Sequence, residues 1–360
     1  MYTEEDLYWI WLCSQQGVGP AKRSGLIRCC GNLANVYEAS RDQYEKAGLT
    51  PEQAQRLEES KDLENWRRQY EKWEEEGIQV LTKADPRYPG RMNNLYPSAD
   101  LLFLRGNAAL LDTPCIAVVG ARKCSSYGAS AARYLGRKLS QAGYTIISGM
   151  AYGIDACAHQ GTLDARGNTI AVLGSGINVC YPSENQRLYD RILQRGLVIS
   201  EYKPGEEPRA GYFPMRNRII AALAQAVIVV EAAERSGALI TADQALENGT
   251  EVFAVPGSMF SPTSKGTHRL IQQGAALVSS WTDIIQTLKG TVPAQSGQDK
   301  HFQDADVQSV WEQIGWEAQN EQQIAVRLGM NAARFMQCVT VIELTGYALR
   351  TSDGCIVRKK

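Results

Sequence analysis

Residues 201–224 concentrate side chains that bind anions and stack on flat rings. Phe213 and a proline directly precede Arg216, Asn217 and Arg218, within a stretch of helical character. Proline suits the first turn of a helix, where free N–H groups attract negative charge. Each guanidinium group can in addition bind a phosphate through two parallel hydrogen bonds. The segment therefore predicts an anion site at the start of a helix.

Three aromatic residues could extend this anion site into a site for nucleic-acid bases. Tyr212 and Phe213 are neighbours at the end of the loop that precedes the predicted helix, and Tyr181 follows an earlier strand. In proteins that bind single strands, stacking of one base on an aromatic ring contributes about 1–3 kcal/mol. An anion site beside these rings is thus suited to an unpaired nucleic-acid strand.

A structural role for the same residues is the alternative. Phe213 would then lie in the core, and one arginine would pair with Glu201 or Glu231. We expect such a pair for Arg216 or for Arg218 but not for both, because residues two apart on a helix point to different sides.

An acid and an imidazole lie four residues apart, at Asp155 and His159, where they would share one face of a helix. They could act as an acid/base pair, but no nucleophile accompanies them, so we interpret them as a buried structural pair. Glu231 and the later Ser236 are interpreted as parts of a helix cap. The sequence shows no metal-ligand spacing and no GxGxxG loop, so we expect no metal, no cofactor and no nicotinamide chemistry.

The elements that would position these side chains repeat regularly in the middle of the chain. Near-continuous apolar runs begin at Ile116, Tyr144, Thr169, Leu197, Ala226, Glu251 and Ala275. Such runs are typical of strands covered on both faces, and their spacing leaves room for a crossover helix between neighbours. We therefore predict an α/β fold with a doubly wound parallel sheet, whose ligands bind outside the carboxyl ends of the strands.

Flanking regions have different patterns. Residues 1–85 are predicted to form a helix-hairpin-helix or SAM-like domain, in which the hairpin at residues 17–22 either meets a phosphate or only caps a helix. The sheet domain is expected to span residues 86–288. Residues 289–303 lack periodicity and indicate a linker. Residues 304–360 predict three helices and a hairpin, which is typical of a winged helix-turn-helix.

Composition limits the class of protein. The chain has 360 residues and a formal net charge of −1, so a nucleic-acid site must be local rather than spread over the surface. Its 9 cysteines are scattered and form no CxxC pair, which argues against a zinc ribbon or a disulfide framework. No apolar run is long enough to span a membrane and the start lacks the basic region of a signal peptide, so we expect a cytosolic protein.

Five segments, taken in order, resemble one known family. They are VGARKCSSYG, SGMAYGIDACAHQGTL, TIAVLGSGINVCYPSENQRLY, SEYKPGEEPRAGYFPMRNRII and VVEAAERSGALITADQALENGTEVFAVPG. These segments are similar to the DNA-processing protein A family, also called DprA or Smf, and the resemblance extends from about residue 86 to residue 281. It implies a bacterial, cytosolic, non-enzymatic protein with an extended Rossmann domain. Such a protein binds incoming single-stranded DNA in natural transformation and loads the RecA recombinase onto it.

The resemblance also implies a homodimer, formed through the Rossmann domain around residues 268–278, and a set of DNA-binding residues. These residues lie at the predicted strand ends and in residues 201–224. They are Gly120, Arg122, Ser148, Gly149, Tyr181, Asn185, Arg187, Arg209, Phe213, Arg216, Asn217 and Arg218. In this hypothesis amides and arginines hold successive phosphates while Phe213 stacks on a base, with no covalent step.

Two other functions fit parts of the sequence. The first is an enzyme that cleaves nucleotides or nucleoside phosphates, similar to the lysine-decarboxylase-like phosphoribohydrolases; the chain has a Ser-Gly pair at Ser236 but not their PGGxGT loop. The second is a DNA-binding regulator that acts through the winged helix. Its third helix offers only Arg334 to read bases, while Arg350 and Arg358 lie in or after the wing, so we expect that domain to contact protein or, weakly, duplex DNA.

Overall fold

The structure is a computed structural model that describes residues 2–93, 95–288, 302, 304–315, 319–345, 347–350 and 355–358. The chain divides into two compact units, Met1–Gln295 and Ser296–Lys360. The predicted linker at residues 289–303 lies, apart from residue 302, outside the described residues. Among the helices described, none is both long and apolar enough to cross a membrane.

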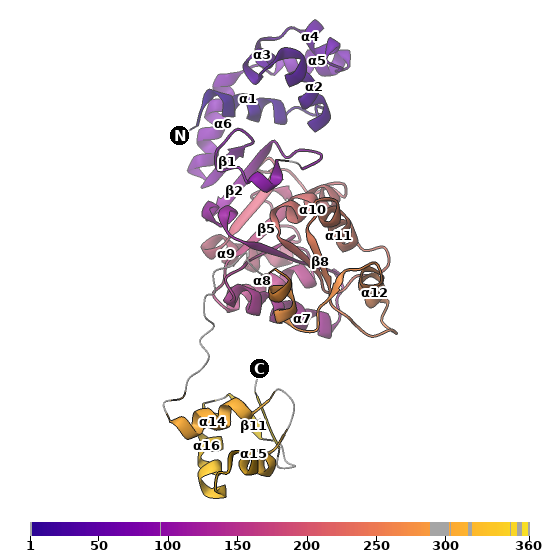
Figure 1. Ribbon diagram of the computed structural model, residues 1–360. Coiled ribbons are helices and arrows are strands. Elements are labelled where there is room, and N and C mark those ends of the chain that lie inside the picture. The colour runs from indigo at the N-terminus through magenta and orange to yellow at the C-terminus, as the bar shows by residue number, and fades with distance from the viewer. Residues whose placement is uncertain are drawn as a thin grey trace. The chain divides into compact units, whose positions relative to one another are not determined.

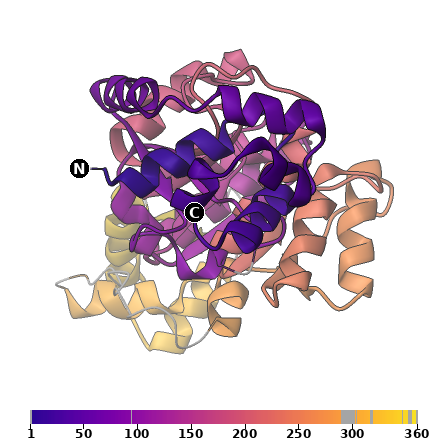
Figure 2. The ribbon, with the colours of Figure 1, turned by 90° about the horizontal axis from the view of Figure 1, so that it is seen from above.

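A 9-stranded sheet forms the centre of the first unit (Figures 1 and 2). Its strands follow the order β1-β2-β6-β5-β4-β3-β7-β8-β9. The pairs β1–β2 and β2–β6 are antiparallel, and all pairs from β6 to β9 are parallel. The strands are β1 (Ile78–Thr82), β2 (Leu101–Gly106), β3 (Cys115–Val119), β4 (Thr145–Ser148), β5 (Thr169–Gly176), β6 (Leu197–Tyr202), β7 (Ala226–Val229), β8 (Glu251–Ala254) and β9 (Ala276–Leu277).

The predicted α/β class with a large, mostly parallel sheet is confirmed, and each predicted apolar run overlaps one of the strands β3 to β9. The antiparallel edge was not predicted. Strand β1 lies within the stretch assigned to the helical domain, so the sheet begins before residue 86. These two strands escape the pattern because antiparallel pairs need no crossover helix, and the regular strand–helix spacing therefore does not extend to them.

Helices cover both faces of the sheet, and this explains why its strands are apolar throughout. On one face they are α7 (Ser126–Gln141), α8 (Ile154–Asp164), α9 (Gln186–Arg195) and α13 (Trp281–Thr287). On the other face they are α10 (Tyr212–Leu223), α11 (Gly237–Glu247) and α12 (Lys265–Gln272). Short 3-10 helices occur at η1 (Gly90–Met92), η2 (Ala108–Asp112), η3 (Ser183–Asn185) and η4 (Pro262–Ser264).

Six helices precede the sheet and lie together beside β1 and β2 in Figure 1. They are α1 (Glu4–Cys13), α2 (Pro20–Cys30), α3 (Leu33–Glu38), α4 (Arg41–Lys46), α5 (Pro51–Glu59) and α6 (Leu63–Glu75). Trp11, Leu26, Tyr44 and Leu57 are fully buried in their shared core. The tight turn after α1 and the start of α2 correspond to the predicted hairpin.

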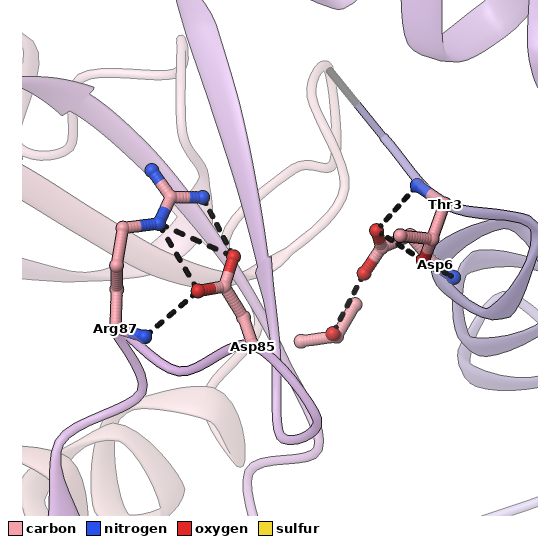
Figure 3. A network of polar contacts seen from close by, with 5 residues as sticks. Thr3, Asp6, Asp85 and Arg87 are labelled. Atoms are coloured by element: carbon pink, nitrogen blue, oxygen red, sulfur yellow. Dashed lines mark hydrogen bonds and ion pairs between the residues drawn. The ribbon is translucent and has the colours of Figure 1, made fainter.

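Polar contacts tie these helices to the sheet. The Arg23 Nε of α2 lies 2.9 Å from Asp100 Oδ2, just before β2, and both side chains are almost fully buried. Asp6 closes the capping box of α1 with Thr3, and its other oxygen accepts a hydrogen bond from the last residue of β1. Figure 3 shows Asp6 with Thr3, and the neighbouring ion pair of Asp85 and Arg87 at 2.6 Å.

The second unit is a small helical and antiparallel domain. Its helices are α14 (Ala305–Gln313), α15 (Glu321–Leu328) and α16 (Ala332–Leu344), and its strands β10 (Gln319–Asn320), β11 (Ala348–Arg350) and β12 (Cys355–Arg358) pair in the order β10-β12-β11. The predicted hairpin turn at residues 352–354 lies outside the described residues. Arg334, the predicted base-reading cation, is bound to Asp304 at 2.7 Å and to Asp306 at 2.8 Å.

Candidate functional site

A cleft opens where the strand order reverses. From β3 the chain moves outward through β4, β5 and β6, and then returns to β7 on the other side of β3. A reversal of this kind leaves a crevice outside the carboxyl ends of the strands, where ligands of α/β proteins bind. The cleft here has a volume of about 620 Å³. We call it the strand-end cleft; its lining includes Gly120, Arg122, Tyr181, Phe213, Arg216 and Asn217.

An aromatic pair with a cation forms one wall of the strand-end cleft. The ring centres of Phe213 and Tyr181 are 5.5 Å apart, and their planes differ by 33°. The guanidinium carbon of Arg122 lies 5.0 Å from the Phe213 ring centre, which is a cation–π contact. Arg122 and Tyr181 are exposed and Phe213 is half-buried. Phe213 therefore lies at the surface of the cleft, and the core position that was the alternative is not observed.

Glycines at two strand ends permit this close packing. A Cβ atom on Gly174 of β5 would lie 2.8 Å from Phe213 Cδ1, so a side chain there would displace the ring. A Cβ atom on Gly120, after β3, would lie 2.7 Å from Ile154 Cγ1 and 2.8 Å from the Glu231 carbonyl oxygen. Gly174 thus lets the Phe213 ring lie against β5, and Gly120 lets Ile154 and the backbone at Glu231 approach the end of β3.

The helix that carries Phe213 begins earlier than the sequence predicts. Helix α10 starts at Tyr212, with Gly211 as its N-cap and no side-chain cap. Pro214 is therefore the third helical residue rather than the first. Its missing N–H costs no helical bond, because the first turn has no acceptor for such groups. The N-terminal end of α10 still directs its positive dipole end toward the cleft.

Arg216 lies beneath the aromatic wall as a buried cation. Arg216 is only 4% exposed. Nη1 donates to the carbonyl oxygens of Gly149, directly after β4, and of Val172, in the middle of β5. Burial lowers the pKa of Arg216 to about 10, so the group remains protonated at neutral pH. Arg216 therefore joins the end of β4 to β5 and places a positive charge in the floor of the cleft.

Arg218 does not lie in the strand-end cleft. It is 2% exposed, and its Nη2 is 2.5 Å from Glu201 Oε2. The pairing of one arginine with Glu201, which was the structural alternative, is thus the observed one, and it involves Arg218. Because α10 turns by about 100° per residue, the side chains of Arg216 and Arg218 point to different sides of the helix.

Four other predicted residues support or flank the strand-end cleft rather than line it. Ser148 is buried and donates to the Val118 carbonyl oxygen at 2.6 Å. Asn185 donates to the Met150 carbonyl oxygen at 2.9 Å and so holds the loop after β4. Arg187 is exposed on α9, and the exposed Arg209 lies over the ring of the neighbouring Tyr212 at 5.6 Å.

Gly149, also predicted to bind DNA, has its backbone occupied within the protein. Its N–H donates to Asp155 Oδ2 at 3.2 Å, and its carbonyl oxygen accepts from Arg216. A Cβ atom at this position would lie 2.6 Å from Arg216 Nη2. Gly149 therefore makes room for the buried charges under the cleft.

Asp155 and His159 do not form a pair with each other. Asp155 Oδ2 accepts hydrogen bonds from the N–H groups of Gly149 and Ala151, and burial raises its pKa. His159 Nδ1 lies 2.7 Å from Thr169 Oγ1, and Thr169 in turn donates to a backbone carbonyl oxygen of β4. Since Thr169 uses its proton there, His159 donates from Nδ1. The predicted pairing of Asp155 with His159 is therefore wrong, because each side chain is bound by separate partners within the fold.

Acid should destabilise the protein through His159. Burial lowers the pKa of His159 to about 3, whereas in the unfolded chain it titrates near 6.5. Its contribution to the free energy of unfolding is therefore complete above pH 6.5 and declines as the pH falls toward 3. We expect wild type to lose about 2–3 kcal/mol more than His159→Asn between pH 6.5 and pH 4.5, in urea unfolding followed by circular dichroism. Equal losses would show that the folded state accepts the proton.

The start of α11 is a part of the site that sequence reasoning missed. Ser236 caps this helix through Ala238 N–H at 3.3 Å, as its interpretation as a cap predicted. Ser236 and Gly237 also line the strand-end cleft, and Asn217 Nδ2 donates to the Gly237 carbonyl oxygen at 3.2 Å. The cap identifies a helix start, but only the folded chain shows that this start faces α10.

Two other possible sources of chemistry at the site are Glu231 and groups of metal-ligating side chains. The carboxylate of Glu231 accepts hydrogen bonds from Ser125, at the start of α7, so it pairs with no arginine of the cleft. Across the described part of the chain no three His, Cys, Asp or Glu side chains are grouped so that they could hold a metal ion.

The fold and the cleft define an α/β protein with a cationic, aromatic ligand site at the carboxyl ends of a mostly parallel sheet. The chain belongs to the DNA recombination-mediator protein A family, whose sequence profile matches residues 79–289. It is 48% identical to the DNA processing protein DprA of Streptococcus pneumoniae over 201 residues, which are 56% of this chain and 71% of that protein. It is 37% identical to the protein Smf of Escherichia coli over 327 residues, 87% of this chain and 86% of that protein.

Two solved structures are similar to this chain. The crystal structure of Streptococcus pneumoniae DprA superposes with a TM-score of 0.70 at 38% identity, over 78% of this chain and 97% of that one. The structure of DprA from Helicobacter pylori, which was studied for its mode of binding single-stranded DNA, has a TM-score of 0.54 at 30% identity, over 59% of this chain and 95% of that one.

Proposed function

We propose that this protein binds single-stranded DNA in the strand-end cleft, as part of the processing of incoming DNA during natural transformation. One observation carries the proposal: Phe213 and Tyr181 present a ring wall with Arg122 over it, above the buried charge of Arg216. Bases stack on such rings whatever their sequence, and cations attract the phosphates between them.

In this proposal different residues contact the bases and the phosphates of the strand. Phe213 and Tyr181 contact bases, and the exposed Arg122 contacts a phosphate. Arg216 contributes its charge from below, because both backbone carbonyls that it binds keep its side chain in the floor. Asn217, in the second turn of α10, binds the start of α11, and residues from the first turns of both helices line the cleft, where free amides favour an anion. No step of this mechanism forms or breaks a covalent bond.

We further propose, from the family, that the protein is not an enzyme and that it loads the RecA recombinase onto the strand. A homodimer through the sheet domain fits the position of β9. Among the described strands, β9 is the last of the sheet and pairs only with β8, and its Leu277 is 47% exposed. An edge strand of this kind is a template for pairing with a second copy.

The second unit is proposed to be a winged helix that contacts protein or, weakly, duplex DNA. Its Arg334 is already bound to two aspartates, which lowers its capacity to reach a base edge.

Fluorescence anisotropy with labelled oligo-dT tests the proposed function. We expect the full chain to bind oligo-dT with an affinity that falls with salt, at a slope near −0.7 per phosphate contact. A chain that lacks residues 304–360 should keep this affinity and slope, since the strand-end cleft lies wholly in the first unit. Preference for a duplex of the same length, or loss of binding in the shortened chain, would contradict the proposal.

A further inference from the structure

A second cleft, of about 710 Å³, lies in the first unit between the N-terminal helices and the loop that joins β6 to α10. One side is formed by the turn and helix start at residues 13–23. The other side is formed by residues 201–218, and Phe103 of β2 closes the inner end. We call it the hairpin cleft.

Arg218 lines the hairpin cleft, and two of its donor atoms are buried without a partner. Its Nη2 is bound to Glu201, but its Nε and Nη1 have no hydrogen-bond partner among the described residues. Buried polar groups, and charged ones above all, are nearly always hydrogen-bonded in folded proteins. A guanidinium group that is 2% exposed and half-paired therefore indicates an acceptor that the chain itself does not provide.

A helix start faces the same space. Helix α2, of 11 residues, begins at Pro20 after Gly19, which has no side-chain cap, and both residues line the hairpin cleft. The first helical bond runs from Arg23 N–H to the Gly19 carbonyl oxygen, so the amides before it have no helical acceptor. The positive end of α2 thus adds to the charge of Arg218.

Aromatic rings and further cations complete the hairpin cleft. Tyr202 and Tyr212 stack with ring centres 3.8 Å apart and an angle of 14° between their planes. Burial raises the pKa of the Cys13 thiol to about 12, so this group adds no negative charge at neutral pH. The charged residues of the lining are Arg23, Lys203, Arg209, Arg218, Glu201 and Glu206. Because Arg23 is paired with Asp100 behind the lining, the cations exceed the carboxylates by one.

The two clefts share one partition, which is the loop before α10 and the first turns of that helix. Neighbouring residues of this partition line opposite clefts. Pro208 and Phe213 line the strand-end cleft, whereas Arg209 and Tyr212 line the hairpin cleft. A strand that leaves the strand-end cleft across this narrow partition enters a space with the same combination of cations, rings and a helix start.

We propose that the hairpin cleft is a second subsite for the phosphates of single-stranded DNA, occupied by nucleotides of the same strand that lies in the strand-end cleft. The proposal rests on the proposed function of the strand-end cleft. It assigns the N-terminal helices a direct part in binding, and it explains the half-paired Arg218. The chemistry required is a phosphate with an adjoining base, which a continuous strand or a separate nucleotide could provide.

The dependence of affinity on strand length tests this proposal. The ratio of the affinities for a 20-nucleotide and a 6-nucleotide oligo-dT is measured for wild type and for Lys203→Ala/Arg209→Ala, which removes two cations from the rim without touching the buried ion pairs. We expect the double variant to lower this ratio by about 10- to 100-fold and to make the salt slope for the longer strand shallower by about 1.4. Arg68→Ala/Lys72→Ala, on exposed residues of α6, is the matched control and should leave the ratio as in wild type.

The outcomes separate the two proposals. Failure of wild type to bind either strand overturns the function proposed for the strand-end cleft. Binding by wild type with an unchanged ratio in the double variant overturns the hairpin subsite alone, as does an equal loss for both lengths. Thymidine 5′-monophosphate is added as a competitor. If only millimolar nucleotide lowers the affinity ratio, the hairpin cleft holds part of a continuous strand. If micromolar nucleotide already saturates the hairpin cleft, the cleft would instead be assigned to a separate ligand.

Discussion

Phe213→Ala lowers the affinity for oligo-dT by about 5- to 150-fold, which corresponds to the loss of one stacked base at about 1–3 kcal/mol. The substitution leaves the slope of log affinity against log salt as in wild type, because it removes no charge. Anisotropy titrations at several salt concentrations measure both quantities. This combination distinguishes stacking from a general loss of attraction.

A matched control for this substitution is Phe260→Ala. Phe260 is 89% exposed and does not line the strand-end cleft, so its removal should leave the affinity unchanged. Arg122→Ala provides the converse test, since it should weaken binding and make the salt slope shallower by about 0.7. If Phe213→Ala binds as tightly as wild type, the ring wall is not the base-binding surface.

Arg216→Met lowers the free energy of unfolding by about 3–5 kcal/mol. The substitution removes the donor to the carbonyl oxygens of Gly149 and Val172 and leaves the buried carboxylate of Asp155 without its neighbouring cation. An unpaired buried acceptor loses its water without compensation, and a buried charge more so. Urea unfolding at pH 7 measures the change.

Arg187→Met is the control for Arg216→Met, because Arg187 is exposed on α9 and its removal should change the free energy of unfolding by about 0.5 kcal/mol or less. A loss below about 1 kcal/mol for Arg216→Met would mean that the strand ends do not need the guanidinium group. In that case Arg216 would be available to bind phosphate directly.

The two arginines of α10 show where prediction from sequence ends. Their types and their spacing along the helix were sufficient to predict that one would pair internally. Which one does so depends on the rotation of α10 relative to the sheet. In the folded chain Arg218 faces Glu201, while Arg216 faces the end of β4 and the middle of β5. The same rotation places Phe213 beside Tyr181, from a loop more than thirty residues earlier.

The glycines of the site also have neighbours that only the folded chain shows. Gly120 and Gly174 are visible in the sequence, but their close approach to Ile154 and Phe213 follows from how the helices pack. The start of α11 was identified by its serine cap, and its place in the cleft depends on the return of the chain to β7.

By itself the sequence determined the parallel strands, the crossover helices and the side of the sheet at which a ligand is expected. The reason is that burial on both faces leaves a near-continuous apolar pattern, from which the strand ends follow. Tertiary structure alone decided which cations remain available, the antiparallel edge of β1 and β2, and the cleft beside the N-terminal helices. The physical reason is that these features depend on distances between segments far apart in the chain. A buried guanidinium group takes whichever acceptor the packing brings within about 3 Å, and the sequence does not encode that neighbour locally.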